Sequence, residues 1–281
     1  MKGIAMQKHR ESSLSIAIRN GINSIEQKNT SLAKNQIAQY TIKIANSLEE
    51  REAVFHLGYQ IYLEKKYIKE NQNQWLIHDY DFLPQTTILI VQDKSKNVVG
   101  TLTLVFDGDG KLPIEKIYHD EFEKLKKNNI RAIEISRLVI ANEYRNEKEI
   151  LQLMINYLFI YAYHVKNYHS LVIQVNPRHK IYYKSLLGFK EIGGEKDCPS
   201  VQNAPAVLLH LPLMHYQSEV LRFASKSEIN KKERSLYPFF LKPEQEKLVA
   251  HYLKTQFKPI SVEEKLYFGY SESSIGQSVS V

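Results

Sequence analysis

The sequence predicts an α/β fold in which helices flank a mixed β-sheet that contains parallel βαβ crossings. The main observation is that strand-like apolar runs alternate with amphipathic helical stretches through the middle of the chain. The 281 residues are 43% hydrophobic and 25% charged, which is ordinary for a globular protein of one large domain or two small ones. With only 11 Gly and 9 Pro, collagen-like and low-complexity classes are excluded.

The first predicted elements are a strand and a capped helix. Residues 1–38 are polar with weak periodicity, so we expect a flexible arm there. The run TIKIA that follows Tyr40 is typical of a strand. Ser47-Leu-Glu-Glu50 then forms a capping box, which predicts a helix from Leu48 to about Tyr67.

A long loop, two strands and a charged helix follow. Residues 68–86 are rich in Asn, Gln, His and Asp, so we expect an irregular loop. Strand patterns cover 87–92 and 98–106, and a polar turn separates them. A charged helical stretch spans about 113–127.

The most regular pattern lies in the next region. It predicts a strand over 131–140, a helix over 147–166, a strand over 170–175, a helix over 178–187, and strands over 189–192 and 206–211. Gly188 is typical of the left-handed cap that ends a helix. Residues 193–205 show no clear pattern, so we expect them to be irregular.

From His215 onward the chain predicts two amphipathic helices. One begins at Pro243 and runs to about Gln256, and the other follows a capping box at Ser261. Their apolar stripes must be buried against the main domain or a partner. We therefore expect a flexible N-terminal arm (1–38), a main domain (39–213), a C-terminal helical extension (214–270) and a disordered, Ser-rich tail (271–281).

The net charge favours an acidic partner. The chain has 38 Lys and Arg against 31 Asp and Glu, a net charge of +7. Nucleic acid, an anionic membrane surface and an acidic carrier protein all fit such an excess. Nucleic acid is not expected, because the basic residues form no long run and no zinc-finger or RNP-like motif accompanies them. Peripheral membrane contact stays open, as does the alternative that the lysines only form solvated faces.

Cysteine and histidine usage argues against a metal site. The single cysteine, Cys198, excludes an internal disulfide framework, and the ten His residues are dispersed without metal-ligand spacing. No secretory signal is visible in residues 1–20. The most apolar stretch, Ile150–Val165, is interrupted by polar residues and is shorter than a membrane-spanning helix. We therefore expect a cytoplasmic protein without a bound metal.

A buried carboxylate is the clearest chemical signal. Glu134-Ile-Ser-Arg137 lies in an apolar strand, and simple alternation puts Glu134 and Ser136 on one face and Arg137 with Ile135 on the other. Burying a carboxylate is costly unless it is paired or functional. Three alternatives stay open: a structural salt bridge, a group that binds the substrate, or a general base whose pKa is raised by burial.

Two further segments carry candidate residues. Asn176 and Pro177 end a strand, and Tyr183 lies on the helix that follows, which by itself favours a structural role over a functional one. Arg145 and Lys148 lie at the start of the long helix, where free backbone amides bind anions. Acidic residues nearby could simply complement the helix dipole.

These motifs together resemble a known superfamily. VVGTLTL (98–104), EISRLVI (134–140) and LVIQVNPRHKIYYKSLLGFKEI (171–192) resemble GNAT-type acyltransferases. Within that superfamily the chain looks most like the N-acyl amino acid synthases, relatives of the acyl-homoserine-lactone synthases. LVAHYLKTQFKPISVEEKLYF (248–268) also looks like their C-terminal extension. The resemblance covers about residues 40–268.

The resemblance implies a splayed central sheet and a fatty acyl donor on a phosphopantetheine thioester, carried by acyl carrier protein or coenzyme A, with no tightly bound cofactor. It implies an amino acid or similar amine as acceptor. The family's catalytic glutamate and tyrosine fall on Glu134 and Tyr183. Substrate-binding positions fall on Asp81, Ser136, Arg137, Asn176 and the pantetheine-binding strand Leu138, Val139 and Ile140. Arg145 and Lys148, at the start of the long helix, are the candidate donor-binding residues.

The chain departs from the family pattern at three places. Gly58 stands where the first helix usually has an Arg, and Thr103 replaces an Arg of the lactone synthases, which argues against lactone synthesis. The glycine-rich loop that binds the coenzyme A diphosphate is missing, since Lys148 and Ile150 replace small residues. This loss, together with the basic charge, is compatible with a carrier-protein donor.

The resemblance therefore predicts direct aminolysis, in which Glu134 takes a proton as a free amine attacks the thioester and Tyr183 protonates the leaving thiolate. Two alternatives stay open. One is an N-acetyltransferase that uses acetyl-coenzyme A, and the other is a non-catalytic GNAT-like binding module. The fatty acyl hypothesis also predicts an apolar tunnel between the sheet and the helices.

Overall fold

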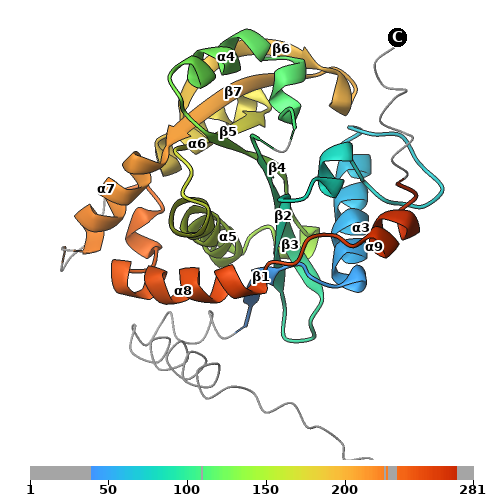
Figure 1. Ribbon diagram of the computed structural model, residues 1–281, viewed down its shortest axis with the longest axis horizontal. Helices are drawn as coiled ribbons and strands as arrows, with labels where there is room; N and C mark the ends of the chain where they lie inside the picture. Colours follow the sequence, from blue (N-terminus) through green and yellow to red (C-terminus); the bar gives the residue numbers. More distant parts are fainter. Residues whose placement is uncertain (1–38, 109, 225, 227–232, 271–281) are drawn as a thin grey trace, which may run out of the picture. The chain divides into compact units, whose positions relative to one another are not determined.

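A seven-stranded sheet organises the computed structural model, which describes residues 39–108, 110–224, 226 and 233–270 (Figure 1). Its strands are β1 (Thr41–Ile44), β2 (Thr87–Gln92), β3 (Val98–Phe106), β4 (Ala132–Ile140), β5 (Ser170–Val175), β6 (Lys190–Cys198) and β7 (Ala204–Pro212). The order across the sheet is β1-β2-β3-β4-β5-β7-β6. Only β4 and β5 are parallel, and every other neighbouring pair is antiparallel. The predicted mixed sheet is confirmed.

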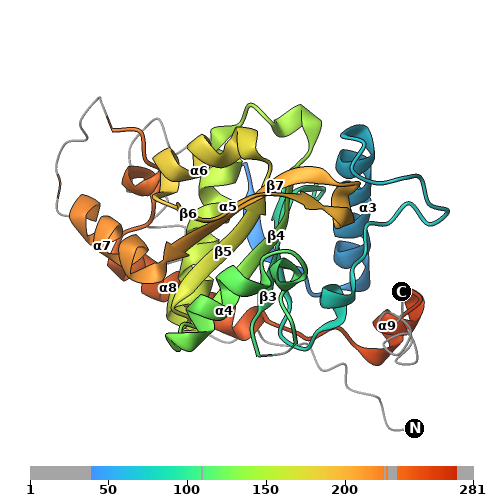
Figure 2. The same cartoon turned by 90° about the horizontal axis from the view of Figure 1, so that it is seen from above.

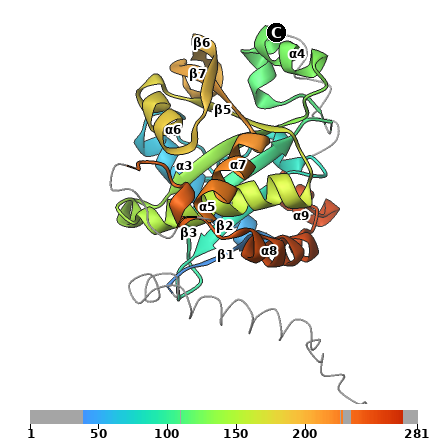
Figure 3. The same cartoon turned by 90° about the vertical axis from the view of Figure 1, so that its left-hand side faces the viewer.

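Helices cover both faces of this sheet. They are α3 (Leu48–Glu64), α4 (His119–Lys127), α5 (Lys148–Ile160), α6 (Lys180–Leu187), α7 (Leu213–Ala224), α8 (Pro243–Gln256) and α9 (Val262–Tyr267). Helix α5 connects β4 to β5 on one face, and α7 and α8 lie alongside it (Figure 3). Helices α3 and α4 pack on the opposite face (Figure 1). None of the helices formed by the described residues is long and apolar enough to cross a membrane.

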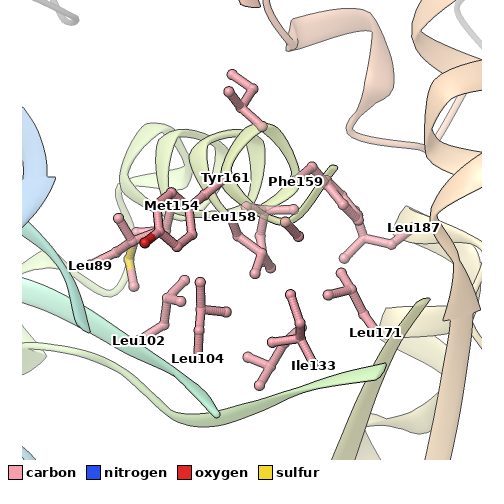
Figure 4. Packing of buried hydrophobic residues seen from close by; sticks show 14 of the residues in the cluster. Leu89, Leu102, Leu104, Ile133, Met154, Leu158, Phe159, Tyr161, Leu171 and Leu187 are labelled. Atoms are coloured by element: carbon pink, nitrogen blue, oxygen red, sulfur yellow. The ribbon is translucent and has the colours of Figure 1, made fainter. Parts of the chain in front are cut away.

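The largest core lies between the sheet and α5 (Figure 4). Leu102, Leu104 and Ile133 of the central strands point toward Met154 and Leu158 of α5, and all five side chains are fully buried. Burial of each such side chain contributes about 1.5–3 kcal/mol. The stripe predicted for the helix over 147–166 therefore faces the core, and a π-helical turn, Tyr161–Val165, completes that helix.

The two parallel strands part halfway along β4. The pairing starts at Ala132 with Ser170 and ends at Ile135 with Ile173. Beyond Ile135, β4 pairs only with β3 on its other side. The predicted splay is thus confirmed, and the backbone of the second half of β4 has no partner strand on the β5 side.

A β-bulge in β4 corrects one sequence prediction. Thr103 pairs with Ser136 and Thr101 pairs with Val139, so two residues of β4 lie opposite Leu102. Arg137 in this bulge has a φ of +45°. The bulge turns its side chain onto the face of Ser136, because both Arg137 and Ser136 contact the segment 79–82 on that face. The prediction that Arg137 shares the face of Ile135 was wrong.

Other differences concern the ends of elements. Strand β6 continues to Cys198 and β7 begins at Ala204, so residues 193–205 are mostly strand and not irregular. Helix α7 was not predicted, because it follows Pro212 of β7 without a turn. The predicted boundary at 213/214 falls at the start of this helix. The expected arm (1–38) and tail (271–281) lie outside the described residues.

Candidate active site

Glu134 is a buried carboxylate with neutral hydrogen-bond partners. It lies on β4 just before the strands part, and only 2% of it is exposed. The backbone N–H of Ile114 donates to Oε2 at 2.8 Å, and Gln174 Nε2 donates to Oε1 at 3.2 Å. No Lys, Arg or His among the described residues forms a salt bridge with it. The alternative of a structural salt bridge is therefore not what the structure shows.

The surroundings of Glu134 suit a proton acceptor. Burial raises the pKa of Glu134 to about 8, although the hydrogen bonds from Ile114 and Gln174 oppose this rise. The negative charge of Glu115 raises it slightly further. A carboxyl group with such a pKa exchanges a proton near neutral pH, which is the working range of a general base.

Gln174 links Glu134 to a second strand, and the sequence reasoning did not identify it. It lies on β5 at the last stretch before the strand ends, on the same face of the sheet as Glu134. Its Oε1 lies 4.0 Å from the Sγ of the buried Cys198, whose Sγ is in turn 3.1 Å from Ser200 Oγ. As the one polar residue in the apolar run LVIQV, it could have been found by the argument that singled out Glu134.

Arg137 is paired with the predicted loop acid. Its Nη1 donates to Asp81 Oδ2 at 2.9 Å and its Nη2 to Asp81 Oδ1 at 2.5 Å, and both side chains are completely buried. Nη1 also donates to the Leu76 carbonyl at 2.9 Å, and Nη2 to Thr103 Oγ1 at 2.8 Å. Arg137 and Asp81 thus anchor the loop 68–86 to β4. Their predicted contact with substrate is not tested by this geometry.

The unusual residues Gly58 and Thr103 both accommodate Arg137. A Cβ added to Gly58 would lie 3.0 Å from Arg137 Cδ, so a larger residue on α3 would push the guanidinium aside. Thr103 supplies one of its hydrogen-bond acceptors. The two departures from the family pattern therefore have one local structural reason.

Ser136 faces the same loop as Arg137. Its Oγ lies 2.8 Å from Tyr80 Oη, and the Tyr80 ring stacks on His78 at 4.9 Å. Burial lowers the pKa of His78 to about 4, so this imidazole is neutral at pH 7. Tyr80 also packs against the apolar cluster that surrounds Ile114. The polar side chains of Ser136, Tyr80 and His78 therefore lie together on the face of the sheet that carries Glu134.

Tyr183 lies on the other side of the sheet. It is half-buried on α6, packs edge-on against Phe189, and belongs to the core that contains α5. Burial raises its pKa well above the usual range, and the neighbouring Tyr182 and Tyr62 raise it further. Tyr183 and Glu134 form no hydrogen bond with each other in the described part of the chain. Glu134 and Tyr183 therefore belong to opposite faces of the sheet, and β4 and β5 part just beyond Glu134.

The predicted donor-binding residues lie beside the splayed strands. Leu138 and Ile140 are half-buried and Val139 is buried, and their strand pairs only with β3. Asn176 Oδ1 accepts a hydrogen bond from the Arg178 backbone at 3.2 Å and so caps the turn after β5. Arg145 and Lys148 are exposed at the start of α5.

Comparison with known proteins decides the family. The sequence model of the family described as N-acyl amino acid synthase FeeM matches residues 53–212, which is more than half of the chain. The chain belongs to the FeeM family. It is accordingly an acyltransferase with a GNAT-like fold. No curated protein sequence matches the chain.

Two solved structures share the fold of this FeeM-family chain. One is FeeM, an N-acyl amino acid synthase from uncultured soil microbes, with 24% identity, a TM-score of 0.55, and coverage of 64% of this chain and 94% of FeeM. The other is BjaI, a coenzyme A-dependent acyl-homoserine lactone synthase solved with MTA. It has 14% identity, a TM-score of 0.51, and coverage of 65% of this chain and 88% of BjaI. At these identities the likeness shows the fold alone.

Two hollows among the described residues can be compared with the apolar tunnel that the fatty acyl hypothesis predicts. A cavity of about 10 Å³, room for one water molecule, lies between Arg51, Phe55 and Asp81. An open depression of about 480 Å³ lies on the outer side of α3, beside His56 and Trp75. Neither of these two hollows touches Glu134 or Tyr183.

One trio of side chains in this FeeM-family chain has metal-like spacing. Ligand atoms of Glu115, His119 and Glu123 lie within 4.8 Å of one another. Lys126 Nζ, however, lies 2.8 Å from Glu115 Oε2 and 3.1 Å from Glu123 Oε1. The lysine ammonium therefore already supplies the positive charge at this trio.

Proposed function

We propose that the chain transfers a fatty acyl group from acyl carrier protein to the amine of an amino acid, producing a long-chain N-acyl amino acid. The reaction is direct aminolysis of a phosphopantetheine thioester, without a covalent enzyme intermediate. The proposal retains the cytoplasmic location expected from the sequence. Family membership supports the acyl transfer, and the donor and acceptor are the proposed part.

The observation that carries the proposal is the state of Glu134. It is a buried carboxyl group with a pKa of about 8, held by Ile114 and Gln174 and without a counter-ion among the described residues. Such a group is costly to stability and is typical of a catalytic site. It also lies next to the point where β4 and β5 part.

The proposed reaction moves one proton from the amine nitrogen to Glu134 and supplies one proton to the leaving sulfur. The acceptor must arrive as a free amine, because an ammonium ion has no lone pair. The nitrogen attacks the thioester carbonyl, and Glu134 takes a proton from it, directly or through a water molecule. The C–N bond forms, the C–S bond breaks, and the donor leaves as a thiol after protonation.

Two groups assist in this proposal. Backbone amides of the unpaired half of β4 stabilise the negative charge on the carbonyl oxygen. Tyr183, whose raised pKa keeps it protonated, donates to the leaving thiolate from the opposite face of the sheet. Holding both substrates beside the splayed strands supplies much of the remaining rate.

Assays with purified protein test the proposal. We expect fatty acyl-carrier protein plus an amino acid mixture to give N-acyl amino acids, detected by mass spectrometry. Product from acetyl-coenzyme A alone would instead favour an ordinary N-acetyltransferase. Absence of product from every donor would contradict the proposal.

Glu134→Gln tests the role of the carboxylate. The amide keeps the size of Glu134 and can still accept from Ile114, so we expect the fold to persist while kcat falls about 10²–10⁴-fold. The matched control is Glu115→Gln, another buried carboxylate, which we expect to lower stability more than kcat. Unchanged activity in Glu134→Gln would contradict the proposal.

A further inference from the structure

Segments from four parts of the chain meet at the edge of the sheet where β4 and β5 end. They are the end of α3, the connection from β4 to α5, the connection from β5 to α6, and the turn from β6 to β7, all along one edge in Figure 2. Asn142 Nδ2 donates to Glu64 Oε2 at 2.7 Å, and Arg178 Nη2 donates to Tyr67 Oη at 3.4 Å. Gln202 Nε2 donates to the carbonyl of Lys66 at 3.1 Å.

This meeting point collects positive charge. Burial of part of its side chain lowers the pKa of Lys65, and the charges of Arg145 and Arg178 lower it further. The negative charge of Glu64 opposes this lowering of the Lys65 pKa. It is already bonded to Asn142, and its Oε2 lies 3.6 Å from Arg145 Nη2.

Two of these cations have no carboxylate partner within the described residues. Lys65 forms no salt bridge there, and the guanidinium of Arg178 donates, within the described residues, only to His179 Nε2, at 3.1 Å, and to Tyr67 Oη. Lys65, Arg145 and Arg178 are exposed cations from three separate segments of the chain, and an anion bound between them offsets their mutual repulsion. The arrangement therefore has the properties of an anion site.

We propose that Lys65, Arg145 and Arg178 bind the phosphate of the phosphopantetheine arm of the donor. In open α/β sheets, ligands bind outside the carboxyl ends of parallel strands, and β4 and β5 both end here. Arg178 offers a planar fork that matches phosphate oxygens, and Lys65 adds a compact charge. Side chains thus take over the role of the small-residue loop that the chain lacks.

The inference deepens the proposed function, since it takes a phosphopantetheine donor as given. The phosphate is common to acyl carrier protein and coenzyme A, so the site accepts the chemistry that the two donors share. An anion was expected from the sequence at the start of α5, with Arg145 and Lys148 as its candidate residues. The site proposed here shares only Arg145 with that expectation, because Lys65 follows α3 and Arg178 follows β5.

Two donor analogues that differ only in the phosphate test the site. Stable thioether analogues of acyl-phosphopantetheine and acyl-pantetheine are titrated into the full chain by calorimetry at low ionic strength, so the result does not depend on turnover. We expect the phosphorylated analogue to bind at least about tenfold more tightly. The difference is expected to disappear in Lys65→Gln/Arg178→Gln and to shrink with added salt.

The matched control is Lys124→Gln/Lys127→Gln, which removes two exposed charges from α4, away from the meeting point. This variant is expected to keep the preference for the phosphate. Equal affinity of the wild type for the two analogues, or loss of the preference in the control as well, overturns the inference. Failure of the proposed function is seen separately, as absence of acyl product from the corresponding thioesters.

Discussion

Two charged residues on the same strand are held in opposite ways. Arg137 is completely buried, but Asp81 meets it with two hydrogen bonds. Glu134, three residues earlier, has only neutral donors, so its proton and not a counter-ion removes the cost of burial. One residue is thus suited to fixing the loop and the other to exchanging a proton.

Asp81→Asn is expected to unfold the protein more easily. It leaves the buried Arg137 guanidinium without its counter-charge, which costs about 3–5 kcal/mol of the free energy of unfolding. Urea unfolding measures the loss. The control is Glu219→Gln, which breaks a surface pair with Arg222 and is expected to cost less than about 1 kcal/mol. Equal losses of the free energy of unfolding in Asp81→Asn and Glu219→Gln would contradict the claim that the Asp81–Arg137 pair anchors the loop 68–86.

The sequence predicted Glu134 as a candidate site residue but did not predict its hydrogen-bond partners. A carboxylate in an apolar strand is visible from the local sequence pattern alone, which is why Glu134 was predicted. Asp81 and Tyr183 were expected only from the family resemblance, because nothing local distinguishes a loop acid or a helical tyrosine. Gln174 was overlooked, although its place in an apolar strand is of the same kind.

At the scale of elements, neighbouring glycines of β6 have different surroundings. A Cβ on Gly193 would lie 2.6 Å from Cδ1 of the fully buried Tyr118, whose Oη donates to the Ala206 carbonyl at 2.6 Å. A Cβ on Gly194 would meet nothing within 4 Å. Gly193 therefore makes room for the ring that closes the core over this end of the sheet.

Gly193→Ala is expected to destabilise the protein by about 1–3 kcal/mol, because the buried ring cannot move away freely. Gly194→Ala, one residue further along, is the matched control and is expected to stay within about 0.5 kcal/mol of wild type. Thermal unfolding compares the two. A larger loss in Gly194→Ala would contradict this account of the packing.

The elements that were predicted well are those with strong periodicity. Strands 87–92, 98–106 and 170–175 agree with β2, β3 and β5 because alternating or continuous apolar residues dictate them locally. The bulge at Arg137 was missed because it depends on the register with β3, which lies far away in sequence. Helix α7 was missed because no turn residue separates it from β7.

At the scale of the whole chain, the C-terminal segment packs against α3. Arg51, which is 5% exposed, donates to the Lys258 carbonyl at 2.9 Å and lies 3.3 Å from Glu264 Oε1. Phe268 packs on Phe55 and Trp75 with ring centroids 4.8 Å and 5.2 Å apart. The predicted second tail helix is therefore held to the main domain by Arg51 and by Phe268, which directly follows it, while Val262 and Leu266 of the helix itself stay exposed.

Phe268→Ala is expected to remove about 3 kcal/mol of stability, because it deletes a ring that is 7% exposed and touches two other aromatic side chains. Leu266→Ala on the same helix is the control, since Leu266 is 65% exposed. Its cost is expected to stay below about 0.5 kcal/mol. Chemical unfolding of both variants checks the packing, and equal costs would contradict it.

The central claim is that the Glu134 carboxylate takes the proton of the attacking amine. The most direct measurement is the pH dependence of kcat/KM, with an acceptor amine that is unprotonated across the range studied. We predict that the wild-type value rises with pH, reaches half of its maximum near pH 8, where Glu134 is half deprotonated, and levels off above that pH. The low activity of Glu134→Gln is predicted to show no such rise. The same rise in Glu134→Gln would contradict the account.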